Sequence, residues 1–241
     1  GFDPQIAISY PAPEIPYQEA VIRADGKLKI AFAPDLGGFG QVDPEMAQHL
    51  ASVMRQLEKN GARIEETCPD LTHLEHSYHT LRGLMWATAA RRLTPEVQAH
   101  FKTTLAENTA FGQALTLEDI VDANLNRSTL FNNMLSLFET FDVLACPVVG
   151  CMPHVSSEEW VKRVGGVELT NYMDWLRFAF LATTTGLPAI SVPVGRGPRG
   201  LPVGLQLIGK PRGEAALLAA ARQVELTFNG PLSPIDPINP S

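Results

Sequence analysis

Three histidines at a spacing of three residues are the first candidates for chemistry. On a helix, His73, His76 and His79 fall within about 120° of one another, so that two of them could share a metal ion. The apolar residues of this segment, Tyr78 and Met85 among them, lie on roughly the opposite side. We therefore expect the histidines to form a solvated helix face, and no metal site is predicted.

Two cysteines flank a loop just past a predicted strand end, where α/β proteins place their ligand sites. These are Cys146 and Cys151, and His154 follows three residues after the second. A cysteine nucleophile needs a neighbouring base and a lowered pKa, and this spacing is a weak sign of either. The pattern favours buried or pocket-lining thiols.

Other patterns with a known mechanism are missing. The sequence contains no G-x-S-x-G elbow, P-loop, G-x-G-x-x-G, H-E-x-x-H or C-x-x-C motif. Ser156-Ser157 is the only serine pair, and its place before Glu158-Glu159 predicts a helix N-cap. The residues alone therefore reveal no complete catalytic group.

The elements that would position these residues begin with a strand–helix–strand unit. Residues 28–33 alternate and stop at a proline, which predicts a strand. Asp43-Pro44 predicts an N-cap followed by proline at the first helical position. Gly61 ends that helix and residues 62–67 form a second strand. Such a unit is typical of a parallel α/β sheet.

The rest of the chain is predicted to be helical first and mixed afterwards. Residues 70–141 have helical patterns, with start signals at Thr94-Pro95 and Thr116. The elements expected after them are a buried strand at 142–146, a helix at 172–185, a hairpin of strands at 189–194 and 201–208, and a helix at 213–228.

Prolines mark both ends of the chain. They predict an extended linker over residues 1–27 and a loose tail over residues 230–241. Between them, residues 28–229 form one α/β domain in which residues 70–141 are a helical insertion.

Composition excludes several classes of protein. The net charge is −7, and no Lys/Arg cluster is longer than Arg91-Arg92, so neither nucleic acid nor an anionic membrane surface is an expected partner. No apolar run approaches the ~18 residues of a membrane span. The 3 cysteines are few and odd in number, which predicts a reducing, cytoplasmic location without a disulfide framework.

Two stretches carry a resemblance to a known family. Residues 185–195 read TGLPAISVPVG and residues 200–209 read GLPVGLQLIG. Together with the helix start at 213–218 (GEAALL), they closely resemble the C-terminal part of the amidase signature family. The segments FDVLACP at 141–147 and GFDP at 1–4 are similar to further family segments. The resemblance covers essentially the whole chain and is closest over 185–218.

This resemblance implies a fold and a division of labour. The fold is a mixed β-sheet layered between helices, as in the C-terminal half of the family's α/β domain. The family hydrolyses amides with a lysine, a serine in a cis peptide and a nucleophilic serine, and it needs no metal or organic cofactor. All three lie upstream of the segments matched here, and no residue of this sequence matches them. The resemblance therefore assigns no catalytic residue within the chain.

What the resemblance implies for this half is the wall of the substrate cleft. The loop at 147–154 is the best candidate wall. Its Cys151 and Met152, together with Trp86 and Trp175, are the predicted substrate-binding residues, although an aromatic residue at such positions is more often simple core.

Three alternatives remain open at this point. Amidotransferase subunits of the family resemble this chain too, but they carry an aspartate for the substrate amine ten residues before Gly-Leu-Pro, where this chain has Leu176. Asp174 lies two residues away, so the sequence favours a general amidase over an amidotransferase. A non-catalytic binding module is the third alternative. The expected partners are a small amide and the missing N-terminal catalytic half. Without that half the chain is expected to be inactive and to associate, for example as a homodimer.

Overall fold

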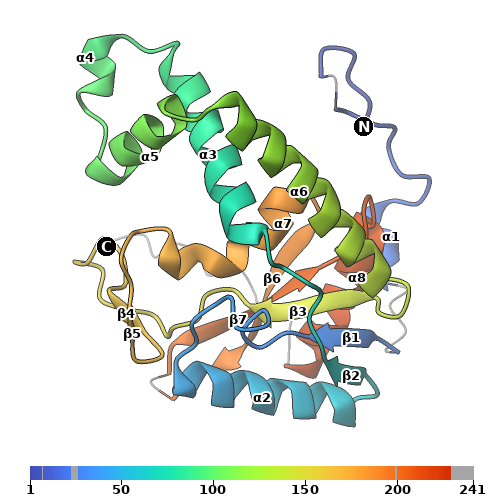
Figure 1. Ribbon diagram of the computed structural model, residues 1–241. Coiled ribbons are helices and arrows are strands. Elements are labelled where there is room, and N and C mark those ends of the chain that lie inside the picture. Colours follow the sequence, from blue (N-terminus) through green and yellow to red (C-terminus); the bar gives the residue numbers. More distant parts are fainter. Residues whose placement is uncertain (7, 23–26, 199, 229–241) are drawn as a thin grey trace, which may run out of the picture.

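A five-stranded mixed sheet with helices on both faces forms the centre of the protein (Figure 1). The computed structural model describes residues 1–6, 8–22, 27–198 and 200–228, so the predicted tail at 230–241 lies outside the described residues. The strands of the sheet are β1 (Lys29–Phe32), β2 (Arg63–Glu66), β3 (Val143–Pro147), β6 (Ala189–Arg196) and β7 (Pro202–Ile208). A separate hairpin pairs β4 (Arg163–Val164) with β5 (Val167–Glu168).

The helices alternate with these strands along the chain. They are α1 (Tyr17–Ile22), α2 (Pro44–Lys59), α3 (Leu74–Ala90), α4 (Pro95–Gln98), α5 (Thr103–Gln113), α6 (Leu117–Leu137), the 3₁₀ helix η1 (Asp174–Ala179), α7 (Phe180–Thr185) and α8 (Glu214–Thr227). Within the described ranges, no helix combines the length and the apolar character that crossing a bilayer requires.

The order of the strands is β2-β1-β3-β7-β6. β1 is parallel to both β2 and β3, whereas β7 is antiparallel to β3 and to β6. The predicted strand–helix–strand unit and the predicted hairpin are both present, and the prediction of a mixed sheet layered between helices is confirmed.

Each face of the sheet has its own core. On one face, α2 and α8 pack against strand residues such as Ile30, Val143 and Leu207. On the other face, α3, α6 and η1–α7 cover Leu144 and Ile208 (Figure 1). Alternate residues of a strand point to opposite faces, so neighbouring Val143 and Leu144 belong to different cores.

The helical region at 70–141 contains α3 to α6, and α4 and α5 stand away from the sheet (Figure 1). The start predicted at Thr116 is a complete capping box. The Asp119 amide donates to Thr116 Oγ1 at 3.2 Å, and the Thr116 amide donates to Asp119 Oδ2 at 2.8 Å. This box fixes where α6 begins.

Two local predictions need correction. The predicted linker at 1–27 contains α1, because the prolines stop at Pro16, whose carbonyl accepts hydrogen bonds from the amides of Glu19 and Ala20. α2 does begin at Pro44, but Asp43 does not cap it with its side chain. The Asp43 carboxylate instead accepts a hydrogen bond from the Gly165 amide at 2.7 Å and so holds the β4–β5 hairpin.

Candidate functional site

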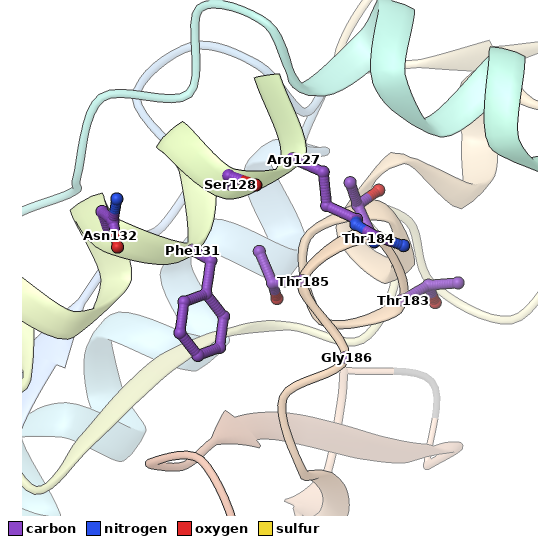
Figure 2. A pocket seen from close by; sticks show the side chains of 8 residues that line it. All are labelled: Arg127, Ser128, Phe131, Asn132, Thr183, Thr184, Thr185 and Gly186. Carbon is purple, nitrogen blue, oxygen red and sulfur yellow. The ribbon is translucent and has the colours of Figure 1, made fainter. Parts of the chain in front are cut away.

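A cavity of about 470 Å³ lies between the middle of α6 and the C-terminal end of α7 (Figure 2). From α6 it is lined by Arg127, Ser128, Phe131 and Asn132, and from the end of α7 by Thr183, Thr184, Thr185 and Gly186. Most of these side chains carry a hydroxyl, amide or guanidinium group. The sequence analysis missed this site, although the three threonines directly precede the Gly-Leu-Pro segment.

The two walls of this larger cavity are placed by neighbouring residues. In α6, Leu130 and Met134 are buried against the sheet, which leaves Arg127 and Asn132 exposed on the cavity side. α7 ends at Gly186 because this residue adopts a left-handed φ of 68°, which glycine does without steric cost. The chain then turns directly into β6.

Three contacts hold the threonine wall in position. The Phe180 ring stacks on the Tyr78 ring of α3 with centroids 3.6 Å apart. The Gln206 side chain of β7 donates to the Phe178 carbonyl at 2.8 Å. Arg177 donates to Glu75 of α3 at 2.6 Å. Such a short helix depends on tertiary contacts of this kind for its stability.

Asp174 belongs to the same support and is fully engaged. Its carboxylate accepts hydrogen bonds from the Thr170 amide and hydroxyl, from the Asn171 amide and side chain, and from Arg177. Partial burial raises the pKa of Asp174, but these hydrogen bonds outweigh it and hold the pKa below its usual value. This carboxylate is a structural group that orders the start of η1.

A smaller, apolar cavity of about 200 Å³ lies beyond β3. It brings together three of the four predicted substrate-binding residues, namely Cys151, Met152 and Trp175. Gly204 leaves it open, because a Cβ atom at this position would lie 2.8 Å from Ser191 Oγ and 3.0 Å from Val148 Cγ2.

Trp86 does not join the other three. It lies half-buried on α3, where the Arg82 guanidinium is 5.9 Å from the centre of its ring, and it lines neither cavity. Its helix places it away from the loop at 147–154, which the sequence did not reveal.

The thiols have no nucleophilic character. Burial raises the pKa of Cys151 to about 11 and that of Cys146 to about 12, although Gln206 donates a hydrogen bond to the Cys146 sulfur. A thiol with such a pKa holds its proton at neutral pH and is a poor nucleophile. Both are wall or core residues.

The histidines and the serine pair are also separate from the cavities. His73 and His76 are exposed, as predicted, but His79 is half-buried with its ring 5.6 Å from that of Phe180, and burial lowers its pKa. Met85, expected on the buried side, is exposed. Ser156-Ser157 forms an exposed turn and caps no helix, because the chain enters β4 without one. Among the described residues no cluster of three or more His, Cys, Asp or Glu side chains could hold a metal ion.

Comparison with known proteins supplies the family. The sequence profile of the amidase family matches residues 2–218, which is most of the chain. The chain belongs to the amidase family. Its fold agrees with this family, since a crystal structure of a bacterial aryl acylamidase of the amidase signature family superposes with a TM-score of 0.80 over 94% of this chain, at 22% identity.

Sequence relatives are amidases as well. A putative amidase from Synechocystis is 27% identical over 91% of this chain, and a fatty acid amide hydrolase from Arabidopsis thaliana is 34% identical over 75% of it. The chain spans 42% and 30% of the length of these two relatives and 49% of the acylamidase structure. It therefore corresponds to half or less of each.

Proposed function

We propose that this chain is the substrate-binding part of an amidohydrolase that cleaves a carboxamide with water to a carboxylate and ammonia. The observation that carries the proposal is the family match over residues 2–218 together with two cavities of ligand size. The catalytic serines and lysine would come from the family's other half. The nucleophilic serine would form an acyl-enzyme as ammonia leaves, and water would then release the acid.

Within this proposal the smaller cavity binds the apolar acyl or aryl group. Its volume of about 200 Å³ and its valine, methionine and tryptophan lining suit such a group. Gly204 keeps the cavity open, so a larger side chain there would fill the space that the ligand needs.

The engaged state of Asp174 bears on the amidotransferase alternative. An aspartate that holds a substrate amine must offer a free carboxylate oxygen, whereas Oδ2 of Asp174 accepts from Thr170 and Asn171 and Oδ1 accepts from Arg177. Neither Leu176 nor Asp174 is therefore suited to bind a glutamine ammonium. This favours simple hydrolysis over ammonia transfer.

The test is ammonia release from amides by the protein in which this chain is joined to the family's other half. We expect hydrolysis of hexanamide, with a raised KM for Gly204→Leu and little change for acetamide, which does not need the apolar cavity. Glutamine hydrolysis that partner subunits stimulate would support the amidotransferase instead. The 241-residue chain alone should release no ammonia, and serine-dependent release by it would contradict the proposal.

A further inference from the structure

We infer that the larger cavity binds an anion, so that the amide substrate carries a carboxylate at the end that Arg127 reaches. The amide part of this statement rests on the proposed function, whereas the anion site rests on the cavity itself. A cavity of about 470 Å³ is large enough for a small dicarboxylic acid or its monoamide.

The first argument is charge. Arg127 is the only charged residue among those that line the cavity, and no carboxylate is there to repel an anion. Arg163, Arg177 and Arg222 each form an ion pair with a glutamate, whereas Arg127 has no acidic partner in the described part of the chain. Its guanidinium is permanently charged and presents paired donors that match a carboxylate.

The second argument is the set of neutral donors around this guanidinium. The Arg127 side chain extends toward the turn that carries Thr183 and Thr184 (Figure 2). The Thr184 side chain lines the cavity, is only 5% exposed, and has a buried hydroxyl without a hydrogen-bond partner in the described structure. A buried polar group of this kind is uncommon and indicates a missing polar partner. Rotation about its χ1 angle brings this hydroxyl to a ligand carboxylate.

The third argument concerns what the cavity does not recognise. Its lining has no acidic group for an ammonium, and the nearby Asp174 is engaged by Thr170, Asn171 and Arg177. The favoured ligands are therefore anions without an amine, such as succinate or succinamate, and not amino acids such as glutamine.

The experiment uses the ¹⁵N-labelled 241-residue chain and three probes: succinate, succinamate and the neutral succinamide. Saturable chemical-shift changes at Thr183–Gly186 are expected with the two anions and not with succinamide. Arg127→Gln should weaken anion binding by about ten- to a hundredfold, the range for hydrogen bonds between charged groups. Arg127→Lys should retain part of it. Arg55→Gln, which removes the same charge from an exposed position on α2, should leave binding unchanged.

Each result decides the matter. Equal binding of succinamide, equal weakening by Arg55→Gln, or no saturable change with succinate would overturn the anion site. Because succinate has no amide bond, its binding is independent of hydrolysis. Succinate binding without hydrolysis of any amide by the joined protein would leave the anion site standing and overturn the proposed function. Hydrolysis of neutral amides with no anion binding would do the reverse.

Discussion

Thiol burial is the clearest chemical property at the scale of single residues. Cys68, Cys146 and Cys151 are all unpaired, and burial raises the pKa values of the three thiols to about 11, 12 and 11. An exposed thiol in the unfolded chain has a pKa near 8.5. The unfolded state therefore loses protons that the folded state keeps, and stability must fall as the pH rises above about 8.5.

This gives a prediction for Cys151→Ala. Wild type should be the more stable at pH 8, and its advantage over the variant should shrink by about 1.4 kcal/mol per pH unit above pH 9, as far as the folded pKa. Urea unfolding between pH 8 and 10.5 measures it. Val149→Ala, which truncates a non-titrating neighbour in the same cluster, should show a constant difference. A constant difference for both variants would mean that the Cys151 pKa is not raised.

At the scale of elements, α6 connects the helical region to the site. Its first turn is capped by Thr116 and Asp119, its inner side packs on the sheet, and its middle presents Arg127 to the larger cavity. The hydrogen bonds from the Thr116 side chain and amide lower the pKa of Asp119. The cap therefore stabilises the helix above the usual carboxyl pKa and weakens as the pH falls through the lowered value.

We accordingly predict that Thr116→Ala lowers the free energy of unfolding by about 1 kcal/mol at pH 7. The loss should be smaller at pH 3, where the protonated Asp119 no longer completes the box. Denaturant unfolding at the two pH values measures both effects. Ser136→Ala, at an exposed site near the other end of α6, should stay within about 0.5 kcal/mol of wild type. Equal losses for the two variants would show that the capping box does not stabilise α6.

At the scale of the whole molecule, the two edges of the sheet differ. The edge strand β2 is short, and its Arg63, Glu65 and Glu66 are exposed charges of the kind that protects an edge. The opposite edge strand, β6, has eight residues and no charge before Arg196. An uncharged edge of this length is a template for another strand, which in the intact family member would be supplied by the other half.

The isolated chain should therefore self-associate through β6. Multi-angle light scattering should show species above the 26.2 kDa monomer, and Ala189→Lys on the edge should shift them toward monomer. Ser136→Lys, which adds the same charge on α6, should leave the distribution unchanged. A wild-type chain that is a highly stable monomer would contradict this expectation. The cytoplasmic location also stays a prediction.

Much of the architecture follows from local sequence patterns. The alternation at 28–33, the capping pattern at Thr116 and the glycine-rich turn between the last two strands each indicate their element, because these signals act between neighbours in the chain. The motif at 185–218 indicated the family for the same reason. The errors, α1 within the linker and the role of Asp43, arose where a distant contact or the end of a proline run decided the outcome.

The sites depended on contacts that no local pattern contains. The sequence determined that Cys151, Met152 and Trp175 belong to or near one loop region, but only the fold brought them to one cavity and left Trp86 on another helix. Arg127 and Thr184 are 57 positions apart in the sequence and meet because α6 and α7 pack on the same face of the sheet. Side-chain types are set by sequence, whereas their neighbours across helices are set by packing, which is a property of the whole chain.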